Sequence, residues 1–261
     1  MSDKKLNDII PGEIIEKRKT SQSHDLPFKY KCEKTMNAYE VEITCMIFIE
    51  SANIIATSSL DPDIEIWSFN SLELNLKLIS ILTGHSKSVI CLKDFPNLKC
   101  LASCSNDNTL KLWDIHKKIC LTTLKFNNII IITCCYNPNY NMEIYTAGEE
   151  KEIFVWGGSP HNYNYIPKHK FKTAHKNGIK HLMFVEDYNL VVSGGKDNKL
   201  CFWDYNNKYA CVETLDFGYD ILCIKYIKKR LIVSCNVGNI NFINMNILKK
   251  KKCTIWKYTY L

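Results

Sequence analysis

The chain has 261 residues, of which 46% are hydrophobic and 23% charged, so it can bury a sizeable core. The longest apolar run, Ile129–Cys135, is far too short to span a bilayer, which argues against a membrane protein. The formal net charge of +7 is modest, and the lysines are spread along the chain rather than gathered in one basic stripe.

The thirteen cysteines point to a reducing compartment. The charged, polar N-terminus has no apolar stretch, so no secretory signal is expected. Many cysteines lie in strand-like runs, where a free thiol behaves as a small hydrophobe. No Cys-x-x-Cys pair occurs, so no metal site or cofactor is expected. The sequence predicts an intracellular, cytoplasmic protein, with the nucleus as the alternative.

The beginning of the chain differs in character from the rest. Residues 1–26 are polar and charged, and we expect them to form a polar N-terminal extension. From Phe28 onward the sequence reads as short strands separated by turn residues, which predicts one domain over residues 27–261.

A repeat is visible within this domain. Strand-like runs end in tryptophan at four positions spaced by 46, 43 and 47 residues: Trp67, Trp113, Trp156 and Trp203. A degenerate fifth run ends at Ile243. This period predicts tandem β units that bury their apolar faces against one another. We expect four-stranded blades near residues 43–83, 89–125, 131–172, 179–215 and 221–259, arranged as a β-propeller.

Two of these units resemble WD40 repeats. Gly84-His85, Asn106-Asp107-Asn108-Thr109 and Leu112-Trp113-Asp114 carry the resemblance in one unit, and Thr173-Ala174-His175, Asp197-Asn198 and Trp203-Asp204 carry it in the other. The resemblance implies an all-β, WD40-type propeller of about five four-stranded blades.

Most rings of this family have seven blades, which needs about 300 residues. We therefore expect an incomplete ring or a fragment of a larger, seven-bladed propeller. The alternative is a closed five-bladed ring, in which a strand at residues 28–33 pairs beside Asn239–Asn244.

Four polar and aromatic residues recur with identical spacing in the two units. The sets are His85, Ser103, Asp107 and Trp113, and then His175, Ser193, Asp197 and Trp203. A serine, a histidine and an aspartate could form a hydrolase triad. An active site is normally made once, however, whereas this set is made twice. The resemblance implies a hydrogen-bonded structural tetrad, and no catalytic residue is predicted.

Two other units keep only part of this set. The partial sets are Thr57, Asp61 and Trp67 in the first unit, and Thr146, Glu150 and Trp156 in the third. The resemblance also implies that certain loops share one face of the ring, where a partner could bind. The candidate residues are Tyr39, Lys87, Asn106, Lys176, Asn177 and Lys196. Tyr163 and Tyr165 form a second candidate, as exposed aromatic anchors.

These features favour a non-enzymatic scaffold that presents a propeller face to other proteins or peptides, including acidic ones. No Gly-rich phosphate loop, metal cluster or unrepeated acid–base pair appears, so no small-molecule substrate is expected. The alternative is an RNA- or ribonucleoprotein-associated module that uses its basic surface, including Lys249–Lys252.

Overall fold

The computed structural model describes residues 41–70, 75–127, 129–139, 143–159, 162–171, 174–246 and 255–259. Residues 37–261 belong to one compact unit. The boundary expected after residue 26, the strand expected at residues 28–33, Tyr39 and Lys249–Lys252 lie outside the described residues.

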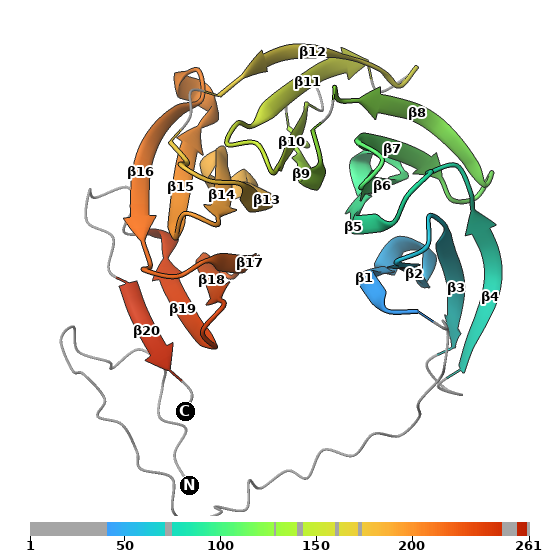
Figure 1. Ribbon diagram of the computed structural model, residues 1–261, viewed down its shortest axis with the longest axis horizontal. Coiled ribbons are helices and arrows are strands. Elements are labelled where there is room, and N and C mark those ends of the chain that lie inside the picture. Colours follow the sequence, from blue (N-terminus) through green and yellow to red (C-terminus); the bar gives the residue numbers. More distant parts are fainter. Residues whose placement is uncertain are drawn as a thin grey trace, which may run out of the picture. The chain divides into compact units, whose positions relative to one another are not determined.

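The described residues form five four-stranded antiparallel sheets, which we call blades 1 to 5 in chain order (Figure 1). Blade 1 contains β1 (Ile43–Ile49), β2 (Ile54–Ser59), β3 (Ile64–Asn70) and β4 (Asn75–Leu82). Blade 2 contains β5 (Val89–Phe95), β6 (Cys100–Ser105), β7 (Thr109–Asp114) and β8 (Ile119–Lys125). Blade 3 contains β9 (Ile131–Tyr136), β10 (Ile144–Gly148), β11 (Phe154–Ser159) and β12 (Asn164–Lys170). Blade 4 contains β13 (Ile179–Val185), β14 (Leu190–Gly195), β15 (Lys199–Asp204) and β16 (Ala210–Asp216), and blade 5 contains β17 (Ile221–Ile227), β18 (Arg230–Cys235), β19 (Asn239–Asn244) and β20 (Ile255–Thr259).

The blades follow one another as in a β-propeller. Each innermost strand contacts the innermost strand of the next blade, from β1 through β5, β9 and β13 to β17. Figure 1 shows the same succession from the blue to the red end of the bar. The predicted all-β propeller of five four-stranded blades is therefore confirmed.

Local sequence explains why the repeated turns and bends form. The last residue of the turn before the third strand has positive φ in three blades: Asn108 (63°), Asn198 (66°) and Gly238 (78°). Asparagine and glycine tolerate this left-handed region better than other residues. The third and fourth strands shift register immediately before Trp67, Trp113, Trp156 and Trp203, where a β-bulge bends the sheet.

The hydrophobic core lies between the blades rather than inside any one of them. Four buried clusters are present, and each combines residues of two consecutive blades. In the first, Ile54 and Ala56 of blade 1 pack with Leu101 and Trp113 of blade 2. No blade can bury its own apolar face, which is the physical reason that the unit must be repeated.

One face of blade 1 is not covered in this way. Met46 is 64% exposed and occupies a position whose counterparts in the other blades are 0–1% exposed: Leu92, Cys134, Leu182 and Ile224. Each counterpart packs against the preceding blade. No described strand of this chain precedes β1 to cover Met46, so the end of blade 1 is open.

The other end of the arc does not support the closed five-bladed alternative. Strand β19 pairs with β18 on one side and with β20 on the other. Both of its edges are therefore occupied, and the strand expected at residues 28–33 has no edge beside Asn239–Asn244.

Candidate functional site

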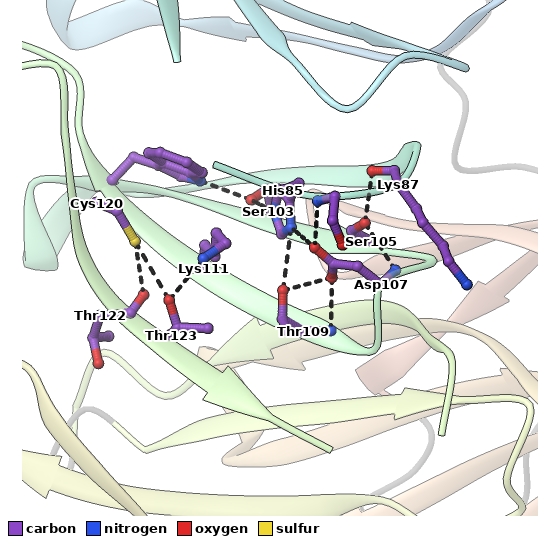
Figure 2. Close-up of polar contacts among 12 residues, drawn as sticks. His85, Lys87, Ser103, Ser105, Asp107, Thr109, Lys111, Cys120, Thr122 and Thr123 are labelled. Atoms are coloured by element: carbon purple, nitrogen blue, oxygen red, sulfur yellow. Dashed lines mark hydrogen bonds and ion pairs between the residues drawn. The ribbon is translucent and has the colours of Figure 1, made fainter. Parts of the chain in front are cut away.

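The full polar set of blade 2 is assembled from four places in the repeat (Figure 2). His85 precedes β5, Ser103 lies in β6, Asp107 lies in the β6–β7 turn and Trp113 lies in β7. The residue before His85 is glycine for two reasons. The φ of Gly84 is 145°, and the Trp113 ring lies 3.3 Å from where a Cβ would sit, so both disfavour a side chain there. The Gly-His pair thus follows from the local geometry.

Hydrogen bonds join the four side chains in one directed chain. His85 Nδ1 lies 2.8 Å from Asp107 Oδ2, and His85 Nε2 lies 2.7 Å from Ser103 Oγ. Trp113 Nε1 donates to Ser103 Oγ at 2.7 Å. Because the carboxylate only accepts, a neutral His85 donates from Nδ1 and accepts the Ser103 hydroxyl proton at Nε2.

Blade 4 repeats this arrangement. His175 Nδ1 lies 2.9 Å from Asp197 Oδ1, and His175 Nε2 lies 2.7 Å from Ser193 Oγ. Trp203 Nε1 donates to Ser193 Oγ at 2.8 Å. The two sets that share their spacing in the sequence therefore also share their geometry.

Both sets have the connectivity of a hydrolase triad. The next question is whether the serine hydroxyl is accessible from solvent. The side chains of His85 and His175 are 0% exposed, and Ser103 and Ser193 are likewise fully buried. Each serine oxygen also accepts the indole N–H and donates to the imidazole. Both the hydroxyl and the imidazole of each set are therefore shielded from solvent and hydrogen-bonded to other members of the set.

Burial also changes how these groups titrate. Desolvation lowers the pKa of His85 and His175, and it outweighs the bonds to Asp107 and Asp197, which would raise it. Burial alone would raise the pKa of both aspartates, but their hydrogen bonds lower it overall. Both imidazoles are therefore held neutral and both carboxylates ionised near neutral pH.

Sequence analysis did not identify Ser86 and Thr109 as hydrogen-bonding partners of Asp107. Its carboxylate accepts hydrogen bonds from the Ser86 backbone at 3.0 Å, the Thr109 backbone at 3.0 Å and the Thr109 hydroxyl at 2.6 Å. The Asp-Asn-Thr order is a typical Asx-turn signal that could have revealed the Thr109 contact. In blade 4 Lys199 replaces this threonine, and only its backbone bonds to Asp197, at 3.3 Å.

The partial sets keep the indole–hydroxyl bond. Trp67 Nε1 donates to Thr57 Oγ1 at 2.8 Å, and Trp156 Nε1 donates to Thr146 Oγ1 at 3.0 Å. Asp61 and Glu150, which the sequence grouped with them, are exposed and lie outside these bonds. In both cases the histidine that would hold the acid is absent from the sequence.

A second buried polar group was not predicted at all. The Glu143 carboxylate is 1% exposed and accepts from Tyr145 Oη at 3.1 Å, Tyr209 Oη at 2.5 Å and Lys168 Nζ at 2.5 Å. Burial raises the pKa of both tyrosines. The group links blade 3 to Tyr209 of blade 4. No sequence pattern predicts it, because these residues form no repeat and Tyr209 lies far from Glu143 along the chain.

Some residues of the predicted loop face are exposed, and others form hydrogen bonds or ion pairs within the chain. Lys87, Lys176 and Asn177 are exposed. Asn106 donates to Ser88 Oγ at 2.8 Å, and Lys196 donates to Glu149 at 2.8 Å. Tyr39, the remaining candidate, lies outside the described residues. Lys87 and Lys176, at neighbouring positions in equivalent loops of blades 2 and 4, thus carry the exposed positive charge of this set.

The expected aromatic anchors are not exposed. Tyr165 is 6% exposed and packs in the core between blades 2 and 3. Tyr163 packs against the same cluster and donates from its hydroxyl to the Leu98 carbonyl at 3.3 Å. The prediction of exposed anchors at Tyr163 and Tyr165 is wrong, because Tyr165 of β12 is buried in this cluster and Tyr163, in the turn before β12, packs against it.

Three further findings concern the part of the chain that the structure describes. No group of three or more histidines, cysteines or acids there could hold a metal ion. All of its cysteines are free thiols. No helix in these ranges is long and apolar enough to cross a bilayer.

One family model matches three stretches of the chain. The model of the WD domain, G-beta repeat, matches residues 30–68, 76–114 and 166–204. The second and third matches contain the two complete His-Ser-Asp-Trp sets. They begin within β4 and β12, each the outer strand of the preceding blade, and the first match begins at the same distance ahead of β1.

Several curated proteins are similar to this chain. The Denticleless protein homolog of Danio rerio is 21% identical over 220 residues, which cover 69% of this chain and 34% of that protein. Mitochondrial division protein 1 of Neurospora crassa is 28% identical over 191 residues, covering 70% and 25%. The Eremothecium gossypii protein of the same name is 24% identical over 184 residues, covering 70% and 19%. The similarity thus spans about a third or less of each relative.

Proposed function

The chain carries WD40 repeats in a five-bladed β-propeller, and from this we propose that it is a non-enzymatic scaffold for protein–protein interaction. The observation that carries the proposal is that its repeated polar sets are buried and hydrogen-bonded internally. Their His, Ser and Trp side chains are buried and bonded to one another, so the groups that resemble a catalytic centre serve to hold the blades.

The proposal places partner binding on the loop face. Lys87 and Lys176 lie in equivalent loops, which join the outer strand of one blade to the innermost strand of the next. Both are exposed, and within the part of the chain that the structure describes neither ammonium group forms a salt bridge. Two exposed cations on loops that share a face suit an acidic or phosphorylated peptide.

A charge-reversal experiment tests this proposal. In the double variant Lys87→Glu/Lys176→Glu, repulsion of an acidic partner should reduce its capture from cell extract at least tenfold. The matched control is Lys117→Glu/Lys208→Glu, because both lysines are exposed in turns between third and fourth strands, away from this face. The control should capture the same proteins as the wild type.

Three results would count against the proposal. Equal capture by both double variants would remove the loop face as the binding site. Absence of any captured protein with the wild type would remove the scaffold role. Capture that disappears after nuclease treatment and weakens steeply with salt would instead support the RNA-associated alternative.

We also propose a reducing, intracellular compartment for the protein. All described cysteines are free, and several of them are buried in the clusters between blades, where they pack as small apolar groups.

A further inference from the structure

Two cysteines lie side by side at the outer edge of blade 4. Cys201 in β15 is fully buried, whereas Cys211 in β16 is exposed. In the strand register Cys201 faces Thr214, and Trp203 faces Cys211, with a bulge between the two pairs. Because residues two apart on a strand share a face, both thiols and Thr214 lie on the same face of the blade.

Contacts confirm that the two thiols belong to one group. Thr214 Oγ1 lies 3.4 Å from Cys211 Sγ and 3.7 Å from Cys201 Sγ. A solvent-accessible sulfur is thus backed by a buried sulfur, and the hydroxyl group of Thr214 contacts both.

The two thiols differ in acidity. The neighbouring Cys201 thiol lowers the pKa of Cys211 to about 6, while Cys211 raises the pKa of Cys201. The thiolate near neutral pH therefore resides on the exposed sulfur, and the thiolate is the nucleophilic form. Redox-reactive cysteines typically combine such a thiolate with exposure and a neighbouring resolving thiol.

We propose that Cys211 is a modification site for hydroperoxides, with Cys201 as its resolving thiol. The Cys211 thiolate attacks one peroxide oxygen, so that an S–O bond forms and the O–O bond breaks. The leaving hydroxide or alkoxide takes a proton from solvent, and Cys211 becomes a sulfenic acid. The Cys201 sulfur then attacks the Cys211 sulfur, the S–O bond breaks, and the departing hydroxide leaves as water with the proton of Cys201. The peroxide gains the two electrons that the thiol pair loses, and an external thiol can reduce the disulfide again.

Blade 2 provides an internal control for this site. Cys120 faces Trp113 and Thr123 faces Lys111, as Cys211 faces Trp203 and Thr214 faces Cys201. Cys120 is exposed, and its sulfur lies 3.6 Å from Thr123 Oγ1. Lys111 Nζ, at 2.9 Å from the same hydroxyl, replaces the second thiol (Figure 2). Cys120 therefore has no resolving thiol at the position of Cys201.

The first test uses the reduced full-length wild-type chain. It is treated with limiting hydrogen peroxide, its remaining thiols are alkylated, and its peptides are analysed by mass spectrometry. A Cys201–Cys211 disulfide is the expected product, with Cys120 in no intramolecular disulfide. In Cys201→Ala the disulfide should be replaced by a sulfenic acid at Cys211 that dimedone traps. Absence of the disulfide in the wild type, or equal oxidation of Cys211 and Cys120, would overturn the proposal.

The second test does not depend on oxidation. At pH 6 half of a thiol with a pKa near 6 is thiolate, and after allowing for its lower intrinsic nucleophilicity it should be alkylated about tenfold faster than a thiol of ordinary pKa. Iodoacetamide labelling of Cys211 should show this advantage in the wild type and lose it in Cys201→Ala. Equal rates in the two proteins would contradict the proposed pairing.

Discussion

Ser103 shows how one neighbour decides what a residue can do. Its oxygen lies 2.7 Å from His85 Nε2, as a nucleophilic serine would, but Trp113 donates an indole N–H to the same oxygen at 2.7 Å. The Ser103 oxygen is therefore buried and already hydrogen-bonded to both the imidazole and the indole. Each polar atom satisfies another, and loss of one leaves its partner buried without a bond.

Removal of single members should therefore destabilise the fold. We expect His85→Ala and Ser103→Ala each to lower the free energy of unfolding by about 1–3 kcal/mol, because each leaves a buried polar partner unpaired. The two losses should be non-additive in a double-mutant cycle. Urea denaturation measures both effects, and His116→Ala, at an exposed histidine in the β7–β8 turn, provides the control. Strict additivity would argue against a connected chain.

The histidines should also make stability depend on pH. Their folded-state pKa values are lowered by burial, so below about pH 6.5 the unfolded chain binds more protons than the folded chain. The free energy of unfolding should therefore fall as pH drops below 6.5, by up to about 1.4 kcal/mol per pH unit for each histidine. His181, whose pKa burial lowers to about 3, adds to the trend.

The comparison with variants isolates the contribution of His85. Denaturation curves between pH 7.5 and 5 should show a shallower dependence for His85→Asn than for wild type. His116→Asn serves as the surface control and should retain the wild-type slope. An unchanged slope in His85→Asn would mean that this imidazole is not held neutral in the folded chain.

At the scale of elements, the open face of blade 1 is the most informative feature. Strand β1 has the same register and bulge as the other innermost strands, yet Met46 and Ile43 are 64% and 51% exposed. The counterparts of Ile43 in the other blades are fully buried: Val89, Ile131, Ile179 and Ile221. Strand β1 therefore has the apolar residues of a strand that packs against a preceding blade, but no described strand packs against them.

A matched pair of truncations measures this difference. Leu92→Ala should cost about 2–5 kcal/mol, because Leu92 is 1% exposed and packs between blades 1 and 2. Met46→Ala, at the equivalent position, should cost less than about 1 kcal/mol, because its side chain lies mostly in solvent. Similar losses in the two variants would show that the face of blade 1 is covered in solution.

At the scale of the whole molecule, repetition decided what could be predicted from sequence. The strand pattern and the recurring tryptophans predicted five blades, and the equal spacing of two polar sets identified the residues that meet. The contacts of Glu143 with Tyr209, of Lys196 with Glu149, and of Thr214 with Cys201 and Cys211 were not predicted. Each of these contacts depends on a geometry that only the folded sheets provide, and none has an identical copy elsewhere in the chain.

The central claim is that the repeated polar sets hold the propeller together, while its surface binds partners. The most direct measurement compares melting temperature with partner affinity in His85→Ala and His175→Ala. The account predicts a lower melting temperature, by about 2–4 °C for each kcal/mol lost, with unchanged affinity for captured partners below the transition. A variant that stays folded but loses partner binding, or a wild-type hydrolase turnover that the substitution abolishes, would contradict it.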